Sequence, residues 1–294
     1  MANLKEVRNR IASVTSTQQI TKAMKMVSAA KLKRATNAIV QLRPYAEKLR
    51  EILANVSGSV EGGASPYIVD RKPEKVLIVV IASNRGLAGA FNANAIKAAN
   101  QLIAGKYGEQ FRAGNVSIVA IGKRVQDYYL KRRYRVVGDN NELFNTLNFE
   151  NTSKITEAIM KGFAEGDYDR VELVYNRFKN AAVQILTTEQ LLPLLPATVE
   201  AEQPKADVDY IIEPDNETII EELIPKAIKV QLYKAVLDSH ASEHGARMTA
   251  MDKATDNAGE LLKSLKLSYN QARQAAITTE LTEIVSGAAA LSNG

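Results

Sequence analysis

The sequence predicts an α/β fold in which two long terminal helices enclose an inserted parallel α/β domain. Two observations predict the helices and one predicts the domain. Near each end of the chain, apolar residues recur in alternating steps of three and four, which is typical of helices in a coiled coil. Between these regions, short apolar runs alternate with helical patterns, which is typical of a parallel sheet with crossover helices.

The first helix is predicted over residues 4–56, within a terminal segment of residues 1–57. Its seam is clearest at Ala35, Ile39, Leu42, Ala46, Leu49, Leu53 and Val56. Pro44 lies inside this run, and proline removes a helical hydrogen bond, so we expect a kink or a break near Arg43. Gly58, Gly62, Gly63 and Pro66 then end the segment.

The inserted domain is predicted over residues 74–196. Expected strands are residues 75–82, 116–121 and 170–175, with a possible fourth at 182–188. The first reads KVLIVVIA, a continuous apolar run that suits a strand buried on both faces. Expected helices are residues 92–103, 123–131 and 153–164, so the segment is interpreted as a Rossmann-like parallel α/β domain.

The last segment, residues 208–294, is predicted to hold a helix of ~75 residues that Asp215 could cap. Its seam is Ala227, Val230, Lys234, Leu237, Ala241, His244, Met248, Met251, Thr255, Ala258, Leu262, Leu265, Tyr269, Ala272 and Ala276. A helix of this length extends ~110 Å, which no single domain of this size could bury. We therefore expect it to pair with the first helix as an antiparallel coiled coil.

The end of the last helix should extend beyond the first helix by ~20 residues, or ~30 Å. This end has its own apolar stripe at Ile277, Leu281, Ile284, Ala288 and Leu291. The stripe is one residue out of phase with the preceding seam, so we expect it to face a different partner.

Composition narrows the possible functions. The chain has no cysteine, which excludes disulfides and thiolate sites, and its longest apolar run, residues 76–82, is far shorter than the ~20 residues of a membrane span. Residues 1–50 contain eleven Lys and Arg against Glu6 and Glu47, a net charge of +9. Such a block indicates either a solvated helix face or an acidic partner: nucleic acid, anionic lipid or an acidic protein surface.

Three motifs suggest chemistry but fit structural roles better. His240-Ala-Ser-Glu243-His244 matches a zinc-protease pattern, yet His244 falls on the coiled-coil seam and no third histidine exists. Gly86-Leu-Ala-Gly89 lacks the full dinucleotide-binding spacing. Gly122-Lys123 lacks the rest of a phosphate-binding loop, so both glycine motifs are interpreted as strand-to-helix turns.

The C-terminal residues carry a resemblance to a known family. Ile277-Thr278-x-Glu280-x-x-Glu283-x-x-x-Gly287-Ala288 resembles the C-terminal signature of the gamma subunits of F-type ATP synthases. Residues 11–31, 43–47, 83–92 and 250–257 are similar to the same family, in the same order along the chain.

The resemblance implies a non-catalytic rotor subunit without cofactor or metal. Its implied partners are three alpha and three beta subunits, the epsilon subunit and the c-ring of the membrane sector, with no nucleic acid. No transit peptide is expected before the first helix, which favours a bacterial source. We therefore expect a peripheral membrane protein on the cytoplasmic face of the inner membrane, held there through the complex.

The resemblance also assigns residues to partners. Met24 and Lys25 would lie near an acidic loop of a beta subunit, although some relatives carry Glu at position 25. The residues implied to contact the alpha and beta ring near the tip are Arg273, Gln274, Thr278, Glu280, Ile284 and Leu291. Tyr210 and Glu213 would lie at the foot, near the c-ring.

Two other classes of protein remain as alternatives. A nucleotide-binding enzyme with helical dimerisation arms would need a phosphate loop, which the sequence lacks. A basic coiled-coil protein that binds nucleic acid would show steeply salt-dependent affinity for DNA.

Overall fold

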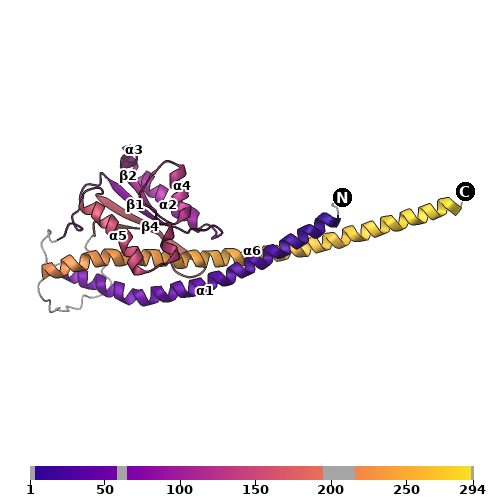
Figure 1. Cartoon of the computed structure of the whole chain (residues 1–294), viewed down its shortest axis with the longest axis horizontal. Helices are drawn as coiled ribbons and strands as arrows, with labels where there is room; N and C mark the ends of the chain where they lie inside the picture. The colour runs from indigo at the N-terminus through magenta and orange to yellow at the C-terminus, as the bar shows by residue number, and fades with distance from the viewer. Residues whose placement is uncertain (1–3, 58–64, 195–215, 293–294) are drawn as a thin grey trace. The chain divides into compact units, whose positions relative to one another are not determined.

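The computed structural model describes residues 4–57, 65–194 and 216–292 (Figure 1). The long helix α1 spans Leu4–Ser57, and α6 spans Asn216–Ser292 over 77 residues. The chain forms two compact units. The first comprises the residues up to Ser28 and those from Met248 onward, and the second comprises Ala29–Arg247. Both helices therefore contribute to both units.

The second unit contains a five-stranded sheet in the order β3-β2-β1-β4-β5. The strands are β1 Val76–Ile81, β2 Val116–Ile121, β3 Arg135–Val136, β4 Arg170–Phe178 and β5 Gln184–Leu192. Two short helices are α3 Gly108–Arg112 and the 3-10 helix η1 Asn141–Asn145. The other helices of this unit are α2 Phe91–Lys106, α4 Lys123–Lys131 and α5 Phe149–Ala164. The predicted Rossmann-like topology is confirmed for β1 to β4, which are parallel.

The expectation of an entirely parallel sheet is wrong for β5, which runs antiparallel to β4. Only five residues separate the two strands, from Lys179 to Val183. A parallel crossover needs a dozen or more residues, whereas a hairpin needs few, so the short connection determines the direction. The short elements β3, η1 and α3 were not predicted, because elements of five residues or fewer carry too few residues for a periodic pattern.

Two hydrophobic cores lie on opposite faces of the sheet. Alternate residues of β1 point to each face: Leu77, Val79 and Ile81 to one, and Val76, Ile78 and Val80 to the other. The first face packs against α5 and the early part of α6, through residues such as Phe163, Ile228 and Leu232. The second face is covered by α2 and α4, as Figure 1 shows.

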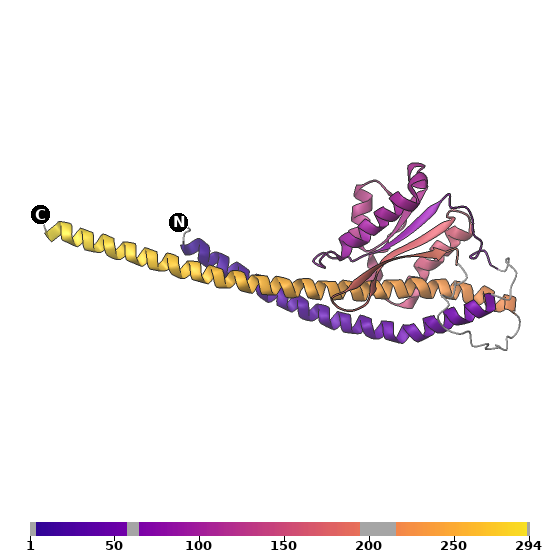
Figure 2. The same ribbon diagram turned by 180° about the vertical axis from the view of Figure 1, so that it is seen from behind.

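Within the second unit, α1 and α6 pack through a smaller core of Ala35, Ile39, Leu237 and Ala241. Figure 2 shows the two helices side by side from the other direction. The pairing is antiparallel, as predicted, because Arg8 contacts Tyr269, Thr21 contacts Thr255 and Lys25 contacts Asp252, so residue numbers rise on α1 as they fall on α6. The α6 seam is buried or half-buried from Ala227 to Ala276 at every predicted position except Lys234, which is exposed.

Of the predicted kink or break near Arg43, the break is wrong, because α1 continues through Pro44 to Ser57, and the kink stays a prediction. A proline inside a helix costs ~3 kcal/mol. Ile39 and Leu49 are buried on either side of it. Each fully buried side chain of this kind contributes ~1.5–3 kcal/mol, enough together to offset the proline. The predicted Asp215 cap lies outside the described residues, as do both foot residues, Tyr210 and Glu213.

Candidate functional site

In the first unit, α1 and α6 are joined by polar contacts as well as by the seam. Arg8 Nη2 donates to the Tyr269 hydroxyl at 2.8 Å, and this hydrogen bond lowers the pKa of Tyr269. Further along the pair, Thr255 Oγ1 lies 2.8 Å from Thr21 Oγ1. Such directional contacts fix the register of two helices whose apolar seam alone would tolerate sliding.

Lys25 forms an ion pair with Asp252 across the two helices. The side chains remain 41% and 49% exposed, so the pair is accessible to solvent. The family resemblance implied that Lys25 lies near an acidic loop of a beta subunit, which stays a prediction, and the contact with Asp252 was not predicted. The antiparallel register could have revealed Asp252. Residues that follow Thr21 on α1 lie opposite residues that precede Thr255 on α6, which places Lys25 near Asp252. The neighbouring Met24 is half-buried.

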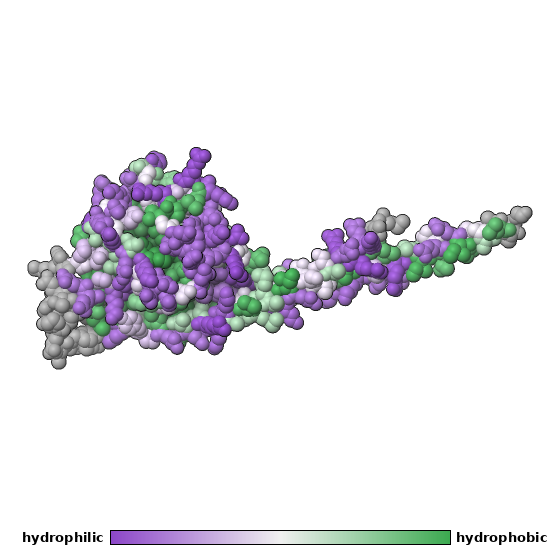
Figure 3. All heavy atoms as spheres, in the orientation of Figure 1, coloured by the Kyte–Doolittle hydropathy of each residue, from purple (hydrophilic) through white to green (hydrophobic). Residues whose placement is uncertain are grey.

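Beyond Ala276, every residue of α6 with a described side chain is exposed. The predicted apolar stripe lies on this stretch, with Ile284 67% and Leu291 87% exposed. Figure 3 shows apolar surface along one side of this end of the helix. Large aliphatic side chains exposed in a row are typical of an interaction surface rather than of a free surface.

The predicted polar residues flank this stripe within two helical turns. Arg273, Gln274, Thr278 and Glu280 are all exposed. The Thr278 hydroxyl donates to the carbonyl of Gln274 at 2.9 Å, whereas neither Arg273 nor Glu280 forms an ion pair with another described residue. The structure therefore brings these residues together and leaves their charges open to a partner. Tyr210 and Glu213 lie outside the described residues.

The His-x-x-Glu-His motif lies in the buried part of α6, within the second unit. His240 Nε2 and His244 Nε2 are 3.1 Å apart, and the His240 ring stacks on Phe144. Glu243 is ion-paired with Arg247, so its carboxylate is already engaged. No cluster of three or more potential metal ligands occurs among the described residues.

The glycine turns lie at the carboxyl ends of β1 and β2, where open α/β sheets commonly bind nucleotides. Here the Arg247 guanidinium donates to the carbonyls of Arg85 and Gly86, at 3.2 and 3.3 Å. Gly122 has φ 114°, and a side chain there would collide with the Ala82 carbonyl. These glycines thus serve close packing between a strand, a turn and a helix.

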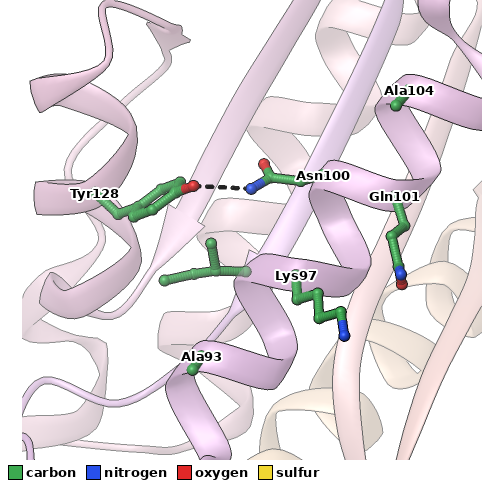
Figure 4. A pocket seen from close by; sticks show the side chains of 7 residues that line it. Ala93, Lys97, Asn100, Gln101, Ala104 and Tyr128 are labelled. Carbon is green, nitrogen blue, oxygen red and sulfur yellow. Dashed lines mark hydrogen bonds between the residues drawn. The ribbon is translucent and has the colours of Figure 1, made fainter.

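A shallow groove of about 570 Å³ lies between α2 and α4. Its lining is mainly apolar, and Figure 4 shows Asn100 Nδ2 bonded to the Tyr128 hydroxyl at 2.9 Å at its edge. Lys97 is the charged residue of the lining. The groove holds no convergent polar groups of the kind that orient a small ligand.

Comparison with known proteins decides the family. The family model described as ATP synthase matches residues 3–291. The ATP synthase gamma chain of Cytophaga hutchinsonii is 56% identical over 295 residues and the two chains cover each other fully. The chain belongs to the gamma-subunit family of F-type ATP synthases. Another member of this family, the ATP synthase gamma chain of Flavobacterium johnsoniae, is 56% identical over 99% of each chain.

Solved structures of mitochondrial ATP synthases contain chains that share the fold. The chain matches a structure of the Tetrahymena thermophila mitochondrial ATP synthase central stalk and c-ring, with a TM-score of 0.56, 25% identity, and coverage of 80% of this chain and 99% of that one. A Euglena gracilis mitochondrial ATP synthase structure matches with a TM-score of 0.65 and 21% identity, covering 98% and 94%. No helix in the described ranges is long and apolar enough to cross a bilayer.

Proposed function

We propose that this chain is the central-stalk rotor subunit of a bacterial F-type ATP synthase and couples rotation of the c-ring to conformational change at the beta subunits. The observation that carries this proposal is the exposed end of α6. There the helix runs on past the seam that ends at Ala276, and an apolar stripe lies open to a partner. The family assignment and the central-stalk relatives support the rotor role.

The apolar and the polar residues at the end of α6 would have different roles in rotation. Dispersive contacts between aliphatic side chains and a surrounding sleeve have no directional preference, so they can be exchanged as the helix turns. Ile284 and Leu291 would form this bearing. Hydrogen bonds and charge pairs depend on direction. Arg273, Gln274, Thr278 and Glu280 would therefore make the contacts that differ between states of the alpha and beta ring.

The chain itself is proposed to be non-catalytic. In a dinucleotide-binding fold, the phosphate lies next to the turn that corresponds to Arg85–Gly86. Here the carbonyls of this turn accept hydrogen bonds from Arg247, so Arg247 already occupies the neighbourhood of the turn. Calorimetric titration of the purified chain with ATP and with NAD is expected to show no stoichiometric binding. Micromolar binding of either nucleotide would favour the enzyme alternative.

Other partner contacts follow from the same proposal. Met24 and the half-exposed Lys25 would face a beta subunit, and Tyr210 and Glu213 would face the c-ring, with epsilon beside them. The chain would thereby be held peripherally at the cytoplasmic face of the membrane. Nucleic acid is not a proposed partner.

Co-expression with the alpha and beta subunits of the same genome tests the proposal. We expect one copy of the chain to co-purify with three alpha and three beta subunits, and the complex to hydrolyse ATP. A matched variant that lacks residues 277–294 should assemble less completely. Recovery of alpha and beta subunits without the chain, under conditions that keep all three soluble, would contradict the proposal.

A further inference from the structure

A second charged surface lies on the α/β domain, around the end of α4. Residues 123–135 contain six Lys and Arg and a single acid, Asp127, so their net charge of +5 equals that of the whole chain. Four of the cations are Lys131, Arg132, Arg133 and Arg135. All four are exposed, and none forms an ion pair with another residue in the described ranges.

The backbone conformation of Arg133 indicates that its side chain is not there for the fold. The amide of Tyr134 donates to the Tyr129 carbonyl at 3.1 Å and that of Arg133 to the Leu130 carbonyl at 3.0 Å, which is the hydrogen-bond pattern of a Schellman helix end. Arg133 occupies the left-handed position of this motif, with φ 58°. Glycine is favoured there, because a side chain is strained in that conformation. An arginine at such a position suggests a role outside local structure.

A few apolar and aromatic side chains lie among these cations. Phe111 of α3 is 42% exposed and stacks on Tyr134, with ring centroids 5.1 Å apart. Leu130 is 52% exposed. We call this set the α3–α4 basic surface: Phe111, Arg112, Leu130, Lys131, Arg132, Arg133, Tyr134 and Arg135. It belongs to the layer on the sheet face opposite α6, so the terminal helices do not cover it (Figure 1).

We propose that the α3–α4 basic surface binds the anionic headgroups of a phospholipid membrane. Guanidinium groups match phosphate oxygens in geometry and charge. Aromatic and aliphatic side chains interspersed with cations are typical of segments that lie at a membrane surface. A protein interface would instead present a larger apolar centre with a polar rim, whereas Phe111 and Leu130 are the only large apolar side chains of this set that are exposed. The acid on α3, Glu109, reduces the charge of the surface without reversing it.

Flotation of the purified full chain with vesicles tests this proposal. Vesicles of phosphatidylcholine are compared with vesicles that also contain about one third phosphatidylglycerol, at low and at physiological salt. Each surface cation contributes to binding by about a factor of five. The triple variant Lys131→Ser, Arg132→Ser, Arg133→Gly is therefore expected to bind anionic vesicles about 100-fold more weakly.

A matched control separates this surface from the basic α1 helix. The variant Lys22→Ser, Lys33→Ser, Arg34→Ser removes the same charge from exposed positions and should retain most of the binding. The single variant Arg133→Gly should lose about fivefold in affinity while its melting temperature stays level or rises, because glycine suits the left-handed position.

Three results would overturn the proposal. One is the absence of binding to anionic vesicles at low salt. Another is an equal loss of binding in the α1 control variant. The third is unchanged vesicle binding in the surface variant together with weaker assembly of the complex, which would identify the partner as a protein.

Discussion

The Nε2 atoms of His240 and His244 lie 3.1 Å apart, one helical turn from each other in the buried part of α6. Burial and the nearby cations Lys31 and Arg247 lower the pKa of His240 to about 4, and burial, His240 and the same two cations lower that of His244 to about 3. Both imidazoles are therefore neutral in the folded chain at physiological pH.

Stability should consequently fall on acidification. An unfolded histidine takes up a proton near pH 6.5, whereas these two do so only near pH 4 and 3 in the folded chain. Their contribution is fully present above pH 6.5 and is lost as the pH falls from there through the folded values, at ~1.4 kcal/mol per unit of pKa difference. Glu243 and Asp238, whose pKa values burial raises, act in the opposite direction and reduce the slope.

The double variant His240→Gln, His244→Gln isolates this effect. Its thermal unfolding should depend less on pH between 6.5 and 4 than that of the unmodified chain, and ATPase activity of its assembled complex at pH 7.5 should be largely retained. Parallel pH profiles for the two proteins would show that the histidines titrate normally. Loss of a bound zinc ion together with all activity would restore the metal interpretation.

A charge exchange tests the Lys25–Asp252 pair. Lys25→Glu places two carboxylates together and should lower the free energy of unfolding by up to ~1 kcal/mol, the range of an exposed pair. Adding Asp252→Lys should restore stability. If ATP-driven proton pumping remains impaired in the stable double variant, Lys25 also meets a partner outside the chain; normal pumping would confine its role to the coiled coil. Lys22→Glu, at an exposed position nearby, is the control for a general charge effect.

The division of the α6 end into bearing and contact residues predicts separable defects. Gln274→Leu with Glu280→Leu should leave assembly nearly normal and lower ATP turnover about tenfold, or ~1.4 kcal/mol in activation free energy. Deletion of residues 285–294 should weaken assembly and leave substantial turnover. ATPase activity normalised to assembled complex measures both. Glu260→Leu with Gln271→Leu, at exposed positions within the paired region, should behave as wild type. The opposite pattern in the two test variants would refute the division.

The buried Glu243–Arg247 pair should matter for folding. Each side chain is only 9% exposed, and Arg247 also holds the Arg85–Gly86 turn. Arg247→Met leaves the Glu243 carboxylate buried without a partner and should cost ~3–5 kcal/mol of unfolding free energy. Combining it with Glu243→Leu should recover part of that loss, since no unpaired charge then remains. A double variant no more stable than Arg247→Met, measured by chemical denaturation, would show that the lost hydrogen bonds to the turn, and not the unpaired carboxylate, account for the loss.

The sequence alone determined the elements that depend on long periodic patterns. The seam from Ala227 to Ala276 predicts a coiled-coil helix because its steps follow helical geometry, and β1 follows from an apolar run that only a doubly buried strand explains. The exposed stripe at Ile277 and Leu281 was also visible, because its phase differs from the seam. The division into residues 1–57, 74–196 and 208–294, and the partner of each site residue, remain predictions.

Tertiary structure decided what depends on residues distant in the chain. Asp252 becomes the partner of Lys25 only when two helices align antiparallel. The short strand β3 pairs through backbone hydrogen bonds with β2, which two residues cannot signal by themselves. Arg247 reaches the Arg85–Gly86 turn because α6 packs on the sheet, and helical periodicity contains no information about that contact. Local patterns record which face of an element is buried, whereas the identity of what covers that face is set by the packing of the whole unit.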